Sequence, residues 1–286
     1  MNDHERTAPT RRRFLHLGAA GAAALAGCAR IGLGPAKRRI PIAVQLYSVR
    51  GECARDLPGS LAKIAAMGYE GVEFAGYYGR SAEDLRKLLD AHGLRCAGAH
   101  VGLQTLLGDE LAKSIDFHRT HGNRFLIGPG LPPQHRKDAG AWLETAKLFN
   151  GIAAKLEPHG MRTGYHNHSV EFKPMGGQAP WDIFFGNTVP SVVMQLDTGN
   201  AMHGGAESVP ILRRYPGRAA TIHCKPFSKA DPKAAIGEDE LPWPEILRLC
   251  RTIGGTEWLI VEYEVGGVPP FDAIERCLDG LKRLGA

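Results

Sequence analysis

Two neighbouring stretches of the sequence decide the fold: NRFLIGPG at residues 123–130 and AWLETAKLFNGIAAKLEPHG at residues 141–160. The first is a short apolar run that ends in Gly and Pro, which is typical of a buried strand. The second has helical apolar spacing and stops at a glycine. Because this alternation runs from residue 40 to the C-terminus, it predicts a parallel sheet whose strands are joined by helices.

Eight strand–helix pairs are predicted. Strands are expected at residues 40–48, 69–76, 94–101, 123–130, 161–168, 191–200, 217–225 and 257–264, and helices at 57–68, 81–93, 109–121, 141–160, 180–186, 207–215, 243–254 and 270–285. Eight pairs in this length predict the α/β class and a (β/α)8 TIM barrel. The alternative is an open doubly wound sheet, but no strand is followed by the Gly-rich phosphate loop that usually accompanies its nucleotide-binding versions.

The first 28 residues are expected to be an export signal. The paired Arg11 and Arg12 precede a short run of small apolar residues at 18–27, a pattern that resembles a twin-arginine (Tat) signal. The run ends in Leu-Ala-Gly-Cys28, which resembles a lipobox, whereas cleavage after Ala26 would release a soluble protein. Residues 29–39 are expected to form a linker and residues 40–286 the barrel, placed in the periplasm or held at the membrane by a lipid anchor.

Charge and cysteine usage narrow the function further. The net charge is +5, but residues 1–39 carry eight Lys and Arg side chains and two acids, so the remainder has a charge of −1. Nucleic-acid binding is therefore not expected. The five cysteines after Cys28 are widely spaced and predict neither a disulfide framework nor a zinc site. Most of them are expected to be buried; they are Cys53, Cys96, Cys224, Cys250 and Cys277.

Polar side chains gather at the carboxyl ends of the predicted strands, where the active site of a TIM barrel lies. They are Glu73, His100, His166, His168, Asp197, Asn200, His223, Lys225, Glu262 and Glu264. Strand alternation puts His223 and Lys225 on one face, and Glu262 with Glu264 on one face. We therefore expect these groups to meet in one mouth. Two carboxylates and an imidazole, from Asp197, Glu262 and His223, predict a divalent-metal site for Mn, Zn, Co or Mg; the alternative is a rim of ion pairs and hydrogen bonds.

The series GYHNHSVEF (residues 164–172), QLDTGN, HCK and VEYE resembles the xylose-isomerase-like TIM barrel superfamily, also called the sugar phosphate isomerase/epimerase family, over nearly all of residues 40–286. The resemblance implies one divalent metal, often manganese, held by Glu, Asp, His and Glu from strands five to eight. Asp197, His223 and Glu262 match that pattern. The strand-five glutamate of the epimerases falls on Gly164 here, which leaves Glu171, His168 or a three-coordinate site. Glu264 is an alternative to Glu262.

These features predict an enzyme that removes a proton next to a carbonyl, with the metal stabilising the resulting enediolate. The expected reaction is isomerisation or epimerisation of an unphosphorylated sugar or keto-sugar, in a chain that could form a homo-oligomer. The alternatives are a dehydratase or lyase acting on 3-keto sugars or glycosides, and an exported sugar-binding lipoprotein without catalysis. The expected acid–base groups are Glu171, Glu262 and Glu264, and the expected substrate contacts are Tyr47, His100, His166, His168, Asn200 and Lys225, with Trp243 as a second aromatic wall.

Overall fold

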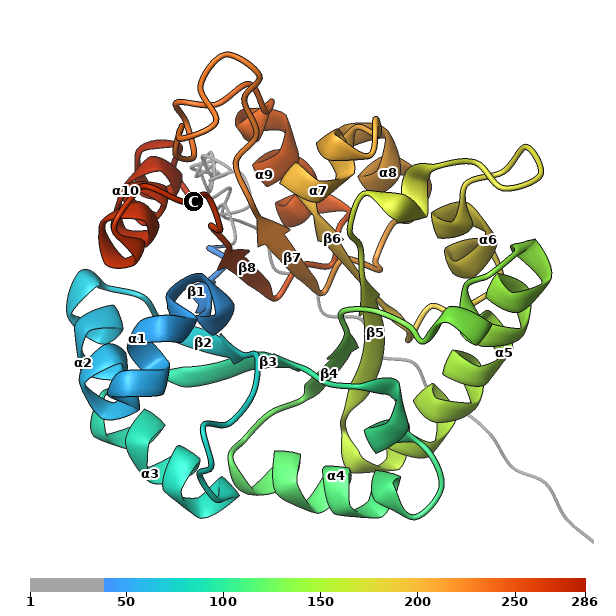
Figure 1. Cartoon of the computed structure of the whole chain (residues 1–286), viewed down its shortest axis with the longest axis horizontal. Coiled ribbons are helices and arrows are strands. Elements are labelled where there is room, and N and C mark those ends of the chain that lie inside the picture. The colour runs from blue at the N-terminus through green and yellow to red at the C-terminus, as the bar shows by residue number, and fades with distance from the viewer. Residues whose placement is uncertain (1–38) are drawn as a thin grey trace, which may run out of the picture. The chain divides into compact units, whose positions relative to one another are not determined.

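The structure, a computed structural model, describes residues 39–286. Within this range eight parallel strands close into a barrel in the order β1 to β8, and β8 pairs with β1 (Figure 1). The strands are β1 (Ile42–Gln45), β2 (Gly71–Phe74), β3 (Arg95–His100), β4 (Phe125–Gly128), β5 (Arg162–His166), β6 (Val193–Asp197), β7 (Thr221–Cys224) and β8 (Trp258–Val261). The predicted TIM barrel is confirmed, and the open sheet is excluded because the barrel is closed.

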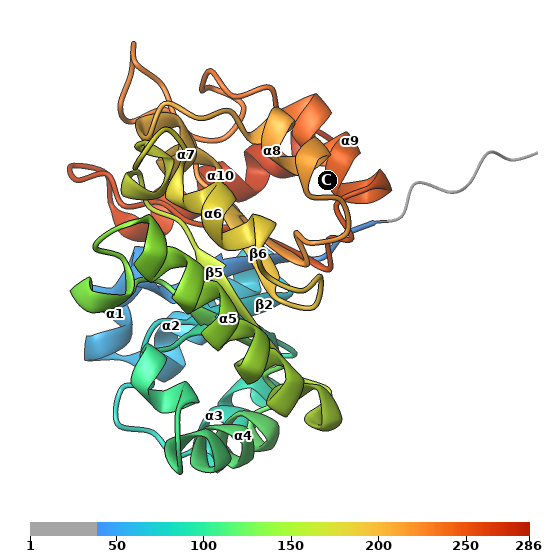
Figure 2. The same ribbon diagram turned by 90° about the vertical axis from the view of Figure 1, so that its right-hand side faces the viewer.

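Helices surround the barrel on its outside (Figures 1 and 2). They are α1 (Arg50–Arg55), α2 (Leu57–Met67), α3 (Ala82–Ala91), α4 (Glu110–Thr120), α5 (Ala139–Leu156), α6 (Pro180–Gly186), α7 (Thr198–His203), α8 (Ser208–Arg214), α9 (Trp243–Thr252) and α10 (Pro270–Arg283). Short 3₁₀ turns follow four of the strands, namely η1 (Leu46–Val49), η2 (Leu103–Leu106), η3 (Pro133–His135) and η5 (Val170–Phe172), and η4 (Glu157–His159) follows α5. Local signals explain the boundaries: the Ser81 hydroxyl caps α3 by accepting from the Asp84 amide, and Gly68 ends α2 with φ 96°.

The end of β6 differs from the prediction of a strand through residue 200. The strand stops at Asp197 and α7 begins at Thr198. The cause is the Asp197 side chain, whose Oδ1 accepts a hydrogen bond of 2.6 Å from the Asn200 amide and so caps the helix. Asp197 therefore both ends a strand and starts a helix, which fixes the direction of its carboxylate.

The interior of the barrel is layered. Its amino-terminal part is filled by small and aromatic apolar side chains: Ala43, Ala97, Phe125, Ile127, Val193, Ala220, Trp258 and Ile260. Above this plug lie four buried polar side chains: Gln45 and Gln195, two residues after Ala43 and Val193 on their strands, together with Glu73 and Thr221. Polar groups thus occupy only the carboxyl-terminal end of a closed apolar barrel, so the fold directs the chemistry of the chain to one mouth.

The predicted export signal and lipobox, including Arg11, Arg12 and Cys28, lie outside the described residues. In residues 39–286 no helix is both long and apolar enough to cross a membrane. The five cysteines in this part of the chain are free thiols, and four of them are buried, as predicted: Cys53, Cys224, Cys250 and Cys277.

Candidate active site

Four side chains from consecutive strands converge at the mouth of the barrel: His166 at the end of β5, Asp197 at the end of β6, His223 in β7 and Glu262 directly after β8. We call them the ligand cluster. One donor atom from each lies within 4.8 Å of the others, and all four side chains are buried. The strand register brings them together, since Asp197 pairs with His223 across β6 and β7. The cluster has the composition of a divalent-metal site.

Within residues 39–286, two buried atoms of the ligand cluster lack a hydrogen bond, and a bound cation would satisfy them. His166 Nδ1 and Asp197 Oδ2 are buried, yet neither has a hydrogen-bond partner among the described residues. Leaving a buried polar atom unsatisfied costs about 1–3 kcal/mol. A cation placed among the four donors would satisfy both atoms at once. The mixture of imidazole nitrogens and carboxylate oxygens suits Mn, Zn or Co better than Ca.

His223 stands between two carboxylates. Its Nδ1 contacts Glu262 Oε2, and its Nε2 lies 2.5 Å from Glu73 Oε2. Burial opposes a charge on the imidazole, but Glu73 and Glu262 outweigh it and raise the pKa of His223 to about 10. The ring is therefore protonated at neutral pH unless a cation takes the place of that proton. Burial also raises the pKa of Asp197, to about 7, with Lys225 opposing the shift and Glu262 adding to it.

Glu73 contacts the ligand cluster through His223. Its fully buried carboxylate accepts hydrogen bonds of 2.7 Å from both Gln45 Nε2 and Gln195 Nε2, besides its contact with His223. Burial would raise the pKa of Glu73, but the His100 and His223 imidazoles hold it below its usual value. The sequence placed Glu73 at a strand end without assigning it a role. The signal was a charged residue inside the otherwise apolar strand GVEF.

Glu171 lies elsewhere. Its side chain is buried, and it accepts 2.8 Å hydrogen bonds from the Tyr165 hydroxyl and from the His168 amide. Tyr165 packs on the outside of the barrel wall, against Trp142 and Phe184. Glu171 thus closes the turn after β5, outside the ligand cluster. The strand-five side chain in the ligand cluster is His166, whereas the sequence pointed to Glu171 or His168.

Gly164 is excluded from that role by its surroundings. A Cβ atom at residue 164 would come within 2.4 Å of the Val193 carbonyl oxygen and 2.8 Å of Ile127 Cδ1. Because the first contact is with the backbone of β6, no side-chain adjustment relieves it. The position of the epimerase glutamate therefore accepts no side chain in this barrel.

A cavity of about 370 Å³ opens beside the ligand cluster. Of the predicted substrate contacts, Tyr47, His100, His166 and His168 line it, together with Glu262 and Glu264. Tyr47 is 42% exposed, and the Arg50 guanidinium lies 4.1 Å from the centre of its ring. An exposed aromatic face held in this way beside a polar cavity is suited to stacking on a sugar ring.

Three predicted residues stand just outside this lining. Lys225 Nζ pairs with Glu264 and lies 3.2 Å from Glu262 Oε1. Asn200 donates to the Asn167 carbonyl at 3.2 Å, so it braces the ends of β5 and β6. Trp243 is buried, and its indole nitrogen donates to Asp239 at 2.6 Å, which makes it part of the core instead of a wall of the cavity.

Asn167 is a residue that the sequence left without a role. It is fully buried; its amide nitrogen donates to the Asp197 carbonyl at 3.1 Å, and its Oδ1 accepts from the Asp197 amide at 2.8 Å. This pair of bonds ties the ends of β5 and β6 together. Asn167 therefore fixes the backbone of one ligand-cluster residue directly after the strand that carries another.

A closed eight-stranded barrel with a His-Asp-His-Glu cluster at its carboxyl-terminal mouth defines the class: a TIM-barrel protein with a candidate metal centre. The family profile described as "Xylose isomerase-like TIM barrel" matches residues 61–284. The chain belongs to this family, as its sequence motifs predicted.

Similar proteins include sugar-related enzymes. The chain is 22% identical over 240 residues to "Rhizopine catabolism protein MocC" of Rhizobium meliloti, covering 71% of this chain and 73% of that protein. It is 22% identical over 189 residues to "Inosose dehydratase" of Clostridium perfringens, covering 59% of this chain and 63%, less than two-thirds, of that protein. A solved "Sugar phosphate isomerase/epimerase" of Parabacteroides distasonis superposes with a TM-score of 0.74 at 23% identity, covering 86% of this chain and 98% of the other. The structural likeness shows the fold.

Proposed function

We propose that the protein is a divalent-metal-dependent isomerase or epimerase. It would remove a proton from the carbon next to the carbonyl of an unphosphorylated sugar or keto-sugar. The observation that carries the proposal is the ligand cluster beside an open cavity; the buried cluster atoms His166 Nδ1 and Asp197 Oδ2 make no hydrogen bond among the described residues. His166, Asp197, His223 and Glu262 would hold the metal, and we propose Mn²⁺ first, with Zn, Co and Mg as the other candidates.

A divalent cation bound here would supply a Lewis acid for the carbonyl and the neighbouring hydroxyl of a substrate. The proposed acid–base groups of the chain are Glu264 and His168, which line the same cavity from β8 and from β5. These strands are three positions apart in the barrel, so the two groups approach a ligand from different sides. Lys225 holds the Glu264 carboxylate by an ion pair. Removal of a proton by one group and its return by the other would give an epimer.

The charge of the cavity supports an unphosphorylated substrate. Within the described part of the chain, its lining contains Glu262 and Glu264 but no Lys or Arg. A phosphate would face these carboxylates without a Lys or Arg side chain in the described lining to pair with, whereas neutral sugar hydroxyls can donate to the carboxylates. His100 adds a hydrogen-bond acceptor to this lining. Its Nε2 lies 2.7 Å from Gln195 Oε1, an oxygen that can only accept, so Nε2 carries the proton of the neutral ring and Nδ1 is the acceptor.

A lyase is the second candidate. The relative named inosose dehydratase favours it, and so does the placement of Gly164 where the epimerases carry a glutamate. Both reactions begin with the same proton abstraction and differ in the next step. In a dehydratase a hydroxyl on the adjacent carbon leaves as water. The departing hydroxyl must be protonated by an acid that lies on the same side of the sugar ring as that hydroxyl. The Lys225–Glu264 pair is the proposed donor for that departure.

Proton exchange in deuterated water tests the proposal. The purified protein is loaded with Mn²⁺ and incubated with keto-sugars, inososes and glycosides, and NMR follows deuterium incorporation or loss of water. Incorporation into recovered substrate or its epimer supports the isomerase, and a dehydrated product supports the lyase. If sugars bind, no divalent metal binds and neither reaction occurs across the panel, the protein is a sugar-binding protein without catalysis.

Asp197→Asn is the decisive variant for this assay. Asparagine keeps the oxygen that caps α7 but loses the charge, so we expect folding to persist while exchange falls by at least about 100-fold. The matched control is Asp182→Asn, which removes a carboxylate that binds Arg214 and Tyr215 on the outside of the barrel. Equal activity in Asp197→Asn and the wild type would overturn the proposed site.

We also propose export by the twin-arginine route to the periplasm, with lipidation at Cys28. The support is the order of paired arginines, small apolar run and Leu-Ala-Gly-Cys in the sequence. Changing Arg11 and Arg12 to lysines should leave the protein in the cytoplasm, and Cys28→Ala should abolish labelling by a radioactive fatty acid. Normal export of the double-lysine variant would contradict the first part of this proposal.

A further inference from the structure

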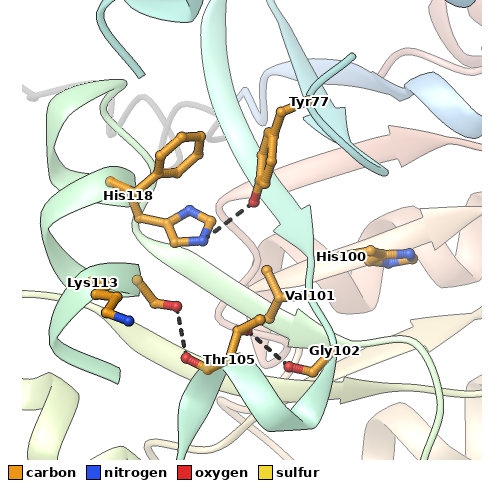
Figure 3. A pocket seen from close by; sticks show the side chains of 9 residues that line it. Tyr77, His100, Val101, Gly102, Thr105, Lys113 and His118 are labelled. Atoms are coloured by element: carbon orange, nitrogen blue, oxygen red, sulfur yellow. Dashed lines mark hydrogen bonds between the residues drawn. The ribbon is translucent and has the colours of Figure 1, made fainter. Parts of the chain in front are cut away.

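A second cavity, of about 400 Å³, lies beside the first. It is bounded by the loop after β2, by η2 and by α4, and His100 belongs to the lining of both cavities. Figure 3 shows Tyr77 pointing toward His118, Lys113 on the same helix as His118, Thr105 opposite that helix, and His100 apart from them. His100 is the residue that the linings of the two cavities share.

The polar groups of the second cavity are already used within the protein. The Ser114 hydroxyl donates to the Thr105 carbonyl at 2.6 Å, and the Thr105 hydroxyl donates to the Gly102 carbonyl at 2.9 Å. Lys113 is 71% exposed and pairs with Glu110. Most of the remaining surface of this cavity is carbon. A second sugar ring would leave most of its hydroxyls unpaired here, which costs free energy.

His118 is held in one tautomer. Its Nδ1 lies 2.9 Å from Asn123 Nδ2, which can only donate, so Nε2 carries the proton and donates to the Tyr77 oxygen at 3.3 Å. The hydrogen of the Tyr77 hydroxyl is then left as a donor. The cavity thus offers this hydrogen bond next to apolar walls.

Those walls are aromatic. The rings of Tyr77 and Phe117 lie 4.6 Å apart between centroids, with an interplanar angle of 55°. Tilted rings at such a distance form a stable apolar surface that packs well against a third ring. An aromatic group with an oxygen acceptor matches both the walls and the hydroxyl of Tyr77.

We propose that the second cavity binds the aromatic aglycone of a glycoside whose sugar occupies the first cavity. The proposal rests on the proposed function and names its substrate class: an aryl glycoside whose sugar ring carries a ketone, because the proposed proton abstraction needs a neighbouring carbonyl. His100, shared by the two linings, would contact the junction between sugar and aglycone. The reactive sugar and the apolar group are thereby recognised separately, on opposite sides of one residue.

Binding of an aromatic fragment tests the second cavity without reference to catalysis. The side-chain methyls of Val101 and Thr105, two residues of its lining, report by ¹³C NMR during titration with p-nitrophenol at millimolar concentrations. We expect saturable shifts in the wild type and at least a tenfold weaker response in Phe117→Ala. Phe271→Ala, which removes another half-buried phenylalanine on α10, should respond like the wild type. No shift in the wild type, or an equal response in Phe117→Ala, would overturn the proposal.

Ser114→Leu is a second test, in case Phe117→Ala weakens binding only because it disturbs folding. Leucine at this position fills the cavity from α4 instead of removing a wall, and it should also abolish the fragment-induced shifts.

The link to the first cavity needs a second titration, with p-nitrophenyl glucoside and methyl glucoside in the presence of Mn²⁺. We expect the aryl glycoside to bind at least tenfold tighter, and Phe117→Ala to remove that preference while leaving methyl glucoside unchanged. An equal affinity for both glucosides would overturn the aglycone assignment. If the preference persists but no deuterium exchange occurs with any substrate, the proposed catalysis fails while this site stands.

Discussion

Two buried histidines of the same barrel, His223 and His118, have pKa values shifted in opposite directions. His223 and His166 belong to the ligand cluster, whereas His118 and His121 lie on and just after α4, beside Tyr77. His223 and His118 are equally buried, and both ring nitrogens of each have a partner. The pKa of His223 is raised to about 10, while burial lowers the pKa of His118 to about 3.

The charge of the partners explains the difference. His223 faces the carboxylates of Glu73 and Glu262, but His118 faces a neutral amide and a neutral hydroxyl. Burial alone favours an uncharged ring, and only an opposite charge nearby overcomes it. A histidine-rich region therefore attracts a cation where carboxylates surround it, and forms a neutral wall where they do not. The following substitutions test this explanation.

The largest effect is expected from His166→Ala. Loss of a donor from the ligand cluster should abolish measurable Mn²⁺ binding in calorimetry, exceeding the roughly 10- to 100-fold that loss of an outer partner costs. Glu171→Gln is the matched test of the other strand-five candidate, and it should change affinity by less than about threefold, because Glu171 bonds Tyr165 and the His168 amide instead. The reverse ranking of the two variants would contradict the assignment of His166.

Replacing the charged partner of His223 should have an intermediate effect. Glu73→Gln keeps the shape of the side chain but gives the imidazole a neutral neighbour, as His118 has. We expect Mn²⁺ affinity to fall by roughly 10- to 100-fold while the protein stays folded by circular dichroism. The control is Glu70→Gln, which removes a carboxylate paired with Arg39 at the other end of β2. Unchanged affinity in Glu73→Gln would show that Glu73 does not orient His223.

The smallest effect is expected at the neutral pair, and on stability only. Burial lowers the pKa of His121 to about 4, below the unfolded value near 6.5, so its contribution to stability is complete above pH 6.5 and is lost as the pH falls towards 4. Between pH 6.5 and 5 the loss is about 2 kcal/mol. His121→Leu should remove that part of the acid sensitivity in urea unfolding and leave Mn²⁺ affinity unchanged.

The exposed His159 is the control for this measurement, and His159→Leu should keep the wild-type difference between pH 7 and pH 5. If His121→Leu loses as much stability as the wild type over this interval, protonation of the buried ring is not the cause.

Strand periodicity predicted the barrel and the residues at its mouth because side-chain direction alternates regularly inside a strand. Asp197, His223 and Glu262 could be assigned to one face in this way. Prediction failed at Glu171, which comes five residues after the end of β5, where the chain has turned. Glu171 follows β5 in a 3₁₀ turn, so neither its direction nor its bond to Tyr165 follows from spacing. The contact between Glu73 and His223 could not be predicted either. It joins β2 to β7 across the barrel, and the two residues are 150 positions apart in the chain.

The crowding at Gly164 limits how this protein could have evolved. A side chain at residue 164 would require the neighbouring strand to move, because the atom nearest to its Cβ would be the Val193 carbonyl oxygen in the present register of β5 and β6. Lineages that share this packing can therefore vary the fifth-strand donor only at residues further along the chain, such as His166. Descendants with new substrates would inherit that restriction, so ancestry as well as chemistry shapes the coordination of the site.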